Sequence, residues 1–144
     1  MPLHMLKLCV GIGSIAELES EIAERLARRQ TTGQAAEQIH TTRVVPKRAS
    51  EILDGGSLFW VIRGHIAVRQ AMRDIRPFTD VEGIARCHLV LEPQIVPVEL
   101  RPCRAFQGWR YLADDTRPSD MNARDGAAEM PEQLRYALRE LCLI

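Results

Sequence analysis

Short apolar runs recur through most of the chain and predict β-strands. Clusters of Gly, Pro and Asp bound these runs, and such clusters end strands and make turns. The predicted strands cover Met5–Val10, Ile39–Val45, Ser57–Arg63, Ile84–Leu91, Gln94–Leu100 and Ala105–Leu112. The run 57–63 is apolar on both faces, which predicts a central strand. Because Pro97 cannot donate to a strand ladder, the run 94–100 is predicted at a sheet edge.

Three helices are predicted beside these strands. Ser14 and Glu17 form a capping box before an apolar stripe of helical period that runs to Arg29. A short helix is predicted after Pro46 and before a glycine pair. A C-terminal helix is predicted from Pro131, because the leucines that follow it share one face.

The period of residues 65–78 is ambiguous, and a strand with a bulge is favoured there over a helix. The order of the elements predicts an α+β fold. Short strands joined by hairpins, with a covering helix, favour a small, partly closed, mainly antiparallel β-barrel. The length of 144 residues predicts a single domain over residues 1–144. The polar, Gly- and Asp-rich stretch 113–130 is predicted to be a flexible linker to the closing helix.

Charge is unevenly placed, although the net charge is zero. Residues 40–111 carry eleven Lys or Arg against seven Asp or Glu. This positive excess is what an anionic partner would require, and ordinary variation in the placement of charged residues explains it equally well. The apolar runs fall short of the roughly 20 residues that cross a bilayer, and the start of the chain does not read as a signal peptide. The four cysteines are isolated from one another, which predicts reduced thiols in a cytoplasmic protein.

The stretch Arg101–Tyr111 holds three arginines and three of the seven aromatic residues. Arginine forks bind phosphates and aromatic rings stack on bases, although a packed strand with a solvated edge has the same composition. Lys47 and Arg48 open the short helix, where cations oppose the helix dipole, so local stability does not explain them. The predicted ligand-binding residues are Lys47, Arg48, Arg69, Phe106, Trp109 and Arg110. Of these, Trp109 is expected to be partly exposed.

Catalytic signatures are weak. Neither G-x-S-x-G nor H-E-x-x-H occurs. Gly11–Ala16 matches a dinucleotide fingerprint, but the second strand and its ribose-binding acid do not follow, and neither cofactor nor metal is predicted. One alternative is a small enzyme acting on a nucleotide or phosphoester, with His88, Asp74 or Glu82 as base. Another is a protein-interaction module that uses the acidic terminal segments.

Several blocks of the sequence, taken together, resemble a family of small bacterial proteins known as domain of unknown function 1489. They are Met5–Gly11, Thr42–Arg48, Gly55–Gly64, Arg69–Gln70, Arg76–Asp80 and Phe106–Leu112. This resemblance covers nearly the whole chain and implies a fold family without an activity. A looser resemblance is to PUA-like barrels, which include the ASCH and EVE domains. It rests on the order of the helix after Pro46, the glycine turn, the strand 60–64 and the later hairpin.

The PUA-like resemblance implies that RNA or a modified base lies in a cleft beside the barrel. The G-x-K-x-x-E-x-R run of ASCH domains does not occur in this chain. The sequence therefore predicts a non-catalytic module that binds RNA or a nucleotide.

Overall fold

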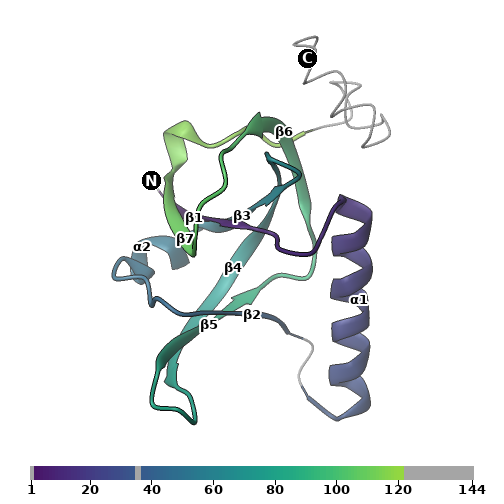
Figure 1. Cartoon of the computed structure of the whole chain (residues 1–144), viewed down its shortest axis with the longest axis vertical. Coiled ribbons are helices and arrows are strands. Elements are labelled where there is room, and N and C mark those ends of the chain that lie inside the picture. The colour runs from purple at the N-terminus through teal and green to yellow at the C-terminus, as the bar shows by residue number, and fades with distance from the viewer. Residues whose placement is uncertain (1, 35–36, 122–144) are drawn as a thin grey trace.

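The computed structural model describes residues 2–34 and 37–121 (Figure 1). This part of the chain is α+β, as predicted, with seven strands in one sheet and two α-helices. The strands are β1 (Leu3–Leu8), β2 (Gln38–Thr42), β3 (Ser57–Ile62), β4 (His65–Thr79), β5 (Ala85–Leu91), β6 (Val96–Pro102) and β7 (Trp109–Ala113). The helices are α1 (Ile15–Thr31) and α2 (Ala49–Leu53), and a 3₁₀ helix (Asp114–Thr116) follows β7.

The sheet is open. Its strand order is β2-β5-β4-β3-β1-β7, and β6 pairs with β4 off this path. β1 lies parallel to β3, and the other pairs are antiparallel. The predicted partly closed barrel is not confirmed, because the strands at the two ends of the path, β2 and β7, pair with β5 and β1 and not with each other.

The long strand β4 holds the sheet together. Its first half pairs with β3 on one edge and with β6 on the other, and its second half pairs with β5. The register shifts between Met72 and Asp74, where β4 leaves β3 and continues along β5. The prediction of a strand with a bulge is confirmed here. The helical alternative is wrong, because cross-strand pairing decides a period that the sequence leaves ambiguous.

Local hydrogen bonds fix the start of α1 and the end of α2. Ser14 Oγ accepts the Glu17 N–H at 3.1 Å, and the Glu17 carboxylate accepts the Gly13 N–H at 3.1 Å. These two reciprocal hydrogen bonds cap the N-terminus of α1. After α2, the N–H of Gly56 donates to the Ile52 carbonyl at 2.7 Å. A Cβ at Gly56 would lie 2.1 Å from the Leu3 carbonyl oxygen, so only glycine fits between α2 and β1.

The apolar core has two parts, one on each face of the central strands. The larger part lies between the sheet and both helices, and includes Ile22 of α1, Ile52 of α2 and Leu58 of β3. The smaller part surrounds Phe59 on the opposite face. Alternation along fully buried β3 sends successive side chains to the two parts, which confirms the prediction of a central strand. Figure 1 shows α1 at the right of the strands and α2 at the left, beside β7.

Residues 114–121 lie against the sheet after β7. Asp120 forms a bridge with Val98 of β6, and the Met121 N–H donates to the Pro97 carbonyl at 2.9 Å. The predicted helix from Pro131 and the linker beyond 121 lie outside the described residues. Within the described ranges, neither helix has the length and apolar character to cross a membrane.

Candidate functional site

The first group of predicted site residues lies where β7 meets the start of α2. Trp109 is partly exposed, as expected, and its Nε1–H donates to the Val44 carbonyl at 2.7 Å. The Trp109 ring meets the Tyr111 ring edge to face, with centroids 4.8 Å apart. Arg48 donates its main-chain N–H to the Tyr111 hydroxyl at 3.2 Å, while its guanidinium binds the Glu51 carboxylate. Neighbouring Lys47 is exposed. This corner is aromatic, with one of its cations already paired.

Arg110 and Phe106 lie on the other face of β7. The Arg110 guanidinium stands 4.6 Å from the centre of the Phe106 ring, over the smaller part of the core. Trp109 and Arg110 are neighbours on a strand, so their side chains point to opposite faces. One ligand lying on one face of β7 therefore cannot contact both side chains.

Arg69 of β4 lies apart from both of these groups, against Asp120 and Ser57. Its guanidinium donates to both carboxylate oxygens of Asp120, at 2.8 and 2.7 Å, and to Ser57 Oγ at 3.0 Å. This bidentate pair lowers the pKa of Asp120, chiefly through the hydrogen bond from Arg69. Because these bonds occupy three of the donor positions of Arg69, the residue holds segment 117–121 on the sheet. The six predicted residues thus lie in three separate places.

Ser57, His4 and Asp114 lie close together but do not form a catalytic triad. His4 Nδ1 accepts the main-chain N–H of Ser57 at 3.0 Å, and His4 Nε2 lies 2.7 Å from Asp114 Oδ1. The Ser57 hydroxyl faces Arg69 instead of the imidazole. With both ring nitrogens occupied and the side chains of His4 and Ser57 buried, this cluster can position a segment but cannot activate a nucleophile.

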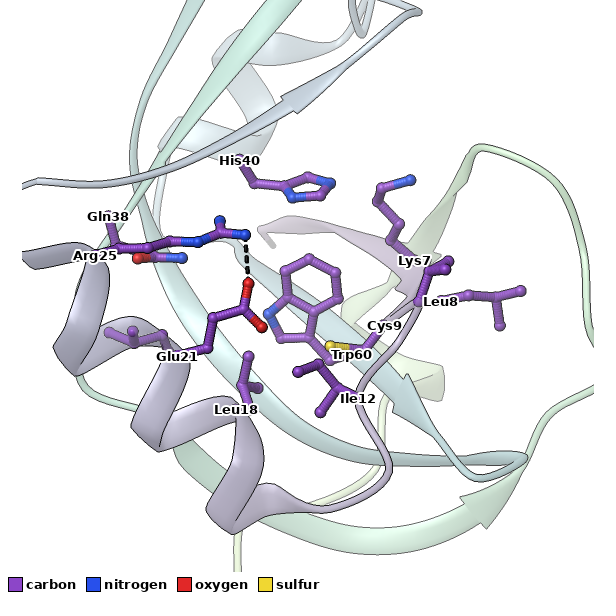
Figure 2. Close-up of a pocket in the computed structure, with 12 residues that line it drawn as sticks. Lys7, Leu8, Cys9, Ile12, Leu18, Glu21, Arg25, Gln38, His40 and Trp60 are labelled. Carbon is purple, nitrogen blue, oxygen red and sulfur yellow. Dashed lines mark hydrogen bonds and ion pairs between the residues drawn. The ribbon is translucent and has the colours of Figure 1, made fainter.

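A pocket of about 120 Å³ lies on the face of the sheet opposite to His4, between α1, the end of β1 and β2 (Figure 2). Figure 2 shows the Glu21–Arg25 pair of α1 on one side, Lys7 of β1 on the other, and the Trp60 indole between them. The lining residues are Lys7, Leu8, Cys9, Val10, Ile12, Leu18, Glu21, Ile22, Arg25, Gln38, His40 and Trp60. The pocket thus combines apolar walls with a few convergent polar groups, as ligand sites usually do.

Two buried polar atoms in this lining have no hydrogen-bond partner. They are Oε1 of Gln38 and Nε2 of His40. The residues stand two apart on β2, so their side chains share a face, and Gln38 is only 4% exposed. The His40 ring meets Trp60 edge to face at 5.0 Å. Trp60 itself is satisfied, since its Nε1–H donates to Gln70 Oε1 at 2.9 Å. Buried polar atoms are nearly always paired, so two orphaned atoms in one pocket single it out as the candidate site.

Of the ionisable groups of the pocket, His40 and Cys9 are uncharged, and Glu21 and Arg25 are paired with each other. Burial, with the nearby charges of Lys7 and Arg25, lowers the pKa of His40 to about 4, so its imidazole is neutral at physiological pH. Burial raises the pKa of the Cys9 thiol to about 12, so it is not a thiolate. Burial also lowers the pKa of Lys7. The Glu21 carboxylate is bonded to Arg25 on the same helix.

Lys7 connects the pocket with the corner around Trp109. In the strand register Lys7 stands opposite Trp60 of β3 on one side and opposite Trp109 of β7 on the other. Directly opposed residues present their side chains on the same face. A row of Trp60, Lys7 and Trp109 therefore crosses three neighbouring strands, with a cation between two indoles.

A family model described as protein of unknown function (DUF1489) matches residues 5–144. The chain belongs to the DUF1489 family. This confirms the family resemblance found in the sequence, and the match includes every residue that lines the pocket. No curated protein and no solved structure is significantly similar to the chain.

Sequence reasoning missed the pocket of this DUF1489 protein. The ligand-binding residues predicted from the sequence do not include Gln38, His40 or Trp60. One signal was present: Lys7 interrupts an apolar strand on the face that it shares with Met5, and alternation along β2 puts Gln38 and His40 together. Polar side chains at inward positions of a strand are the pattern that would have found the site.

Proposed function

We propose that this protein is a non-catalytic module that binds RNA or a nucleotide, with a base entering the pocket beside Trp60. The observation that carries the proposal is the pair of unpartnered buried atoms, Gln38 Oε1 and His40 Nε2, in one open pocket. Leaving a buried polar atom unpaired costs about 1–3 kcal/mol. A base edge, with donors and acceptors in one plane, supplies partners for both atoms and an apolar face for the pocket walls.

The charges around the pocket favour an anionic ligand. Lys7 and Arg25 stand on opposite sides of the pocket, and the carboxylate there, Glu21, is already bonded to Arg25. A phosphate leaving the pocket past Lys7 would reach the corner of Trp109, where Lys47 is exposed. Lys47, Arg48 and Trp109 are therefore retained as outer contacts of the proposed ligand. In this proposal Arg69, Phe106 and Arg110 serve the fold.

The ionisation states support binding over catalysis. General acids and bases work best with a pKa near the operating pH, whereas the pKa of His40 is about 4 and that of Cys9 about 12. The bases considered for an enzyme, His88, Asp74 and Glu82, belong to β4, β5 and the turn between them, outside the pocket lining. Asp74 is also bonded to Arg76 at 2.9 Å.

Two further features agree with the proposal. The loose resemblance of the sequence to PUA-like domains, which bind RNA or a modified base beside a barrel, points to the same class of ligand, although the sheet of this protein is open. The thiols of Cys9, Cys87 and Cys103 are free, which fits a reducing compartment such as the cytoplasm. We therefore place the proposed activity in the cytoplasm.

The test is titration of fluorescently labelled single-stranded RNA and of the four ribonucleoside monophosphates, with salt raised from about 50 mM to about 200 mM. We expect binding that weakens as salt rises, and its loss in His40→Phe, which fills the pocket and removes Nε2. His88→Phe is the matched control, because His88 lies on the neighbouring strand β5 and stacks on Phe78 outside the pocket. Absence of binding to RNA and to all four nucleotides at the lowest salt would overturn the proposal.

A further inference from the structure

The size of the pocket limits the ring that can enter it. Its volume is about 120 Å³. An engineered apolar cavity of about 150 Å³ in another protein holds one benzene molecule. At this volume the pocket takes at most one six-membered ring, and the fused rings of a purine would have to displace the walls around Ile12, Leu18 and Trp60. Because the pocket opens to solvent, the substituents of a single ring can leave through its mouth.

The orphaned atoms define what the edge of this ring must carry. Gln38 Oε1 is an acceptor, so it requires an N–H donor from the ligand. His40 is neutral, so its Nε2 either donates or accepts according to tautomer. The two side chains come from the same face of β2, two residues apart, and both line the pocket. A ring with an N–H next to a carbonyl or ring nitrogen offers a partner to each orphaned atom.

The charges exclude a cationic ring. Lys7 and Arg25 both act on the site, as their effect on the pKa of His40 shows. The charge of the Glu21 carboxylate is already shared with Arg25, so it adds little attraction for a ligand cation. The ring is therefore neutral, and any negative charge of the ligand lies outside it, toward the Lys7 ammonium.

We infer that the pocket selects a pyrimidine base: a single, neutral ring with an N–H donor on its edge, whose sugar and phosphate leave past Lys7. This inference rests on the proposed function and specifies its ligand. Gln38 is the residue that recognises the N–H donor, and the walls of the pocket exclude purines by size.

Isothermal titration with uridine, cytidine, adenosine and guanosine 5′-monophosphates tests the inference, since these ligands share charge and sugar. We expect the two pyrimidine nucleotides to bind at least about tenfold more tightly than the two purine nucleotides. Methylation of the ring N–H in 3-methyluridine 5′-monophosphate should weaken binding about 10- to 100-fold, because Gln38 Oε1 then meets a methyl group. Equal affinity for purines, or no effect of the methyl group, would overturn the inference.

Gln38→Met provides a second test, because methionine keeps the length of the side chain and removes the acceptor. We expect pyrimidine binding to fall about tenfold or more while the variant melts no lower than the wild type, since no hydrogen bond of the orphaned oxygen is lost. Gln94→Met, at an exposed position outside the pocket, is the matched control and should bind as the wild type does.

The outcomes separate the inference from the proposed function. If all four nucleotides bind equally and Gln38→Met weakens them all, the pocket binds nucleotides without selecting pyrimidines, so only the inference fails. If nucleotides bind and Gln38→Met has no effect, the base does not contact Gln38, so the inference and the placement of the base in the pocket fail while the binding of RNA or a nucleotide stands. If neither RNA nor any nucleotide binds, the proposed function fails and the inference falls with it.

Discussion

Ser57 donates its main-chain N–H to Nδ1 of His4 over 3.0 Å, which places the proton of this buried imidazole on Nε2. Nε2 in turn donates to Asp114 Oδ1 at 2.7 Å. A protonated His4 would direct an N–H at the N–H of Ser57. Burial lowers the pKa of His4, although the hydrogen bond to Asp114 raises it. The neutral His4 side chain therefore joins β1, β3 and the 3₁₀ helix.

The first prediction follows from this pairing. His4→Phe should lower the free energy of unfolding by about 1–3 kcal/mol, because the buried N–H of Ser57 loses its acceptor. Urea unfolding measures the change as a lower midpoint at unchanged slope. His88→Phe is the control and should stay within about 0.5 kcal/mol, since the His88 imidazole hydrogen-bonds to the exposed Thr41 hydroxyl and a phenylalanine ring can keep the stack on Phe78. Equal midpoints for His4→Phe and the wild type would contradict this role.

The second prediction concerns the effect of pH through His40. Its pKa falls from 6.5 to about 4 on folding, mainly through burial. Above pH 6.5 the His40 imidazole is neutral in both the folded and the unfolded chain, so it does not lower the free energy of unfolding there. As pH falls from 6.5 toward 4, the unfolded chain takes up a proton that the folded chain does not. The free energy of unfolding should therefore fall in this window, by on the order of 2–3 kcal/mol.

Unfolding by urea between about pH 7 and pH 4 measures this slope. In His40→Phe the slope should be shallower across the window, with the remaining decline coming in the same direction from His4. Acidic residues with lowered pKa values, such as Asp114 and Asp120, lose their stabilising charge at still lower pH. Parallel pH profiles for the wild type and His40→Phe would show that His40 does not titrate in this way.

Much of the fold could be predicted from local patterns. The Ser14 cap and the buried strand β3 each follow from residues close together in the sequence, whereas the strand state of β4 depends on its pairing with other strands. The opposite orientation of Arg69 and Gln70 also follows from strand geometry, and the structure places them on different faces. The openness of the sheet could not be predicted, since it depends on which strands pair at its two ends.

The candidate site was harder to predict, because its chemistry depends on contacts between distant segments. The basic middle of the chain suggested an anion-binding surface, yet many of its arginines pair with acids in the folded chain. Arg69 binds Asp120, 51 positions away, and Arg76 binds Glu37, 39 positions away. A count of charges cannot show such pairing. Likewise, the lack of a partner for Gln38 Oε1 is visible only when every neighbour is in place.

The third prediction tests the strap formed by residues 117–121. Asp120→Ala should lower the free energy of unfolding by about 1–3 kcal/mol, because Arg69, whose side chain is 20% exposed, loses its bidentate partner. Glu24→Ala removes an exposed pair with Arg28 on α1 and should cost no more than about 0.5 kcal/mol. Urea midpoints compare the two variants. An equal, small effect of both would mean that the strap adds little to stability.

The fourth prediction decides which face of the sheet meets a phosphate chain. Lys7 shares its face with the pocket and with Trp109, whereas Arg110 lies over Phe106 on the other face. Lys7→Met should reduce the slope of log affinity against log salt by about 0.7 for single-stranded RNA, as expected for the loss of one phosphate contact. Arg110→Met should leave the slope unchanged. Since burial disfavours the charge of Lys7, Lys7→Met should melt no lower than the wild type. The reverse pattern, with the slope reduced only in Arg110→Met, would move the ligand to the opposite face of the sheet, away from the pocket.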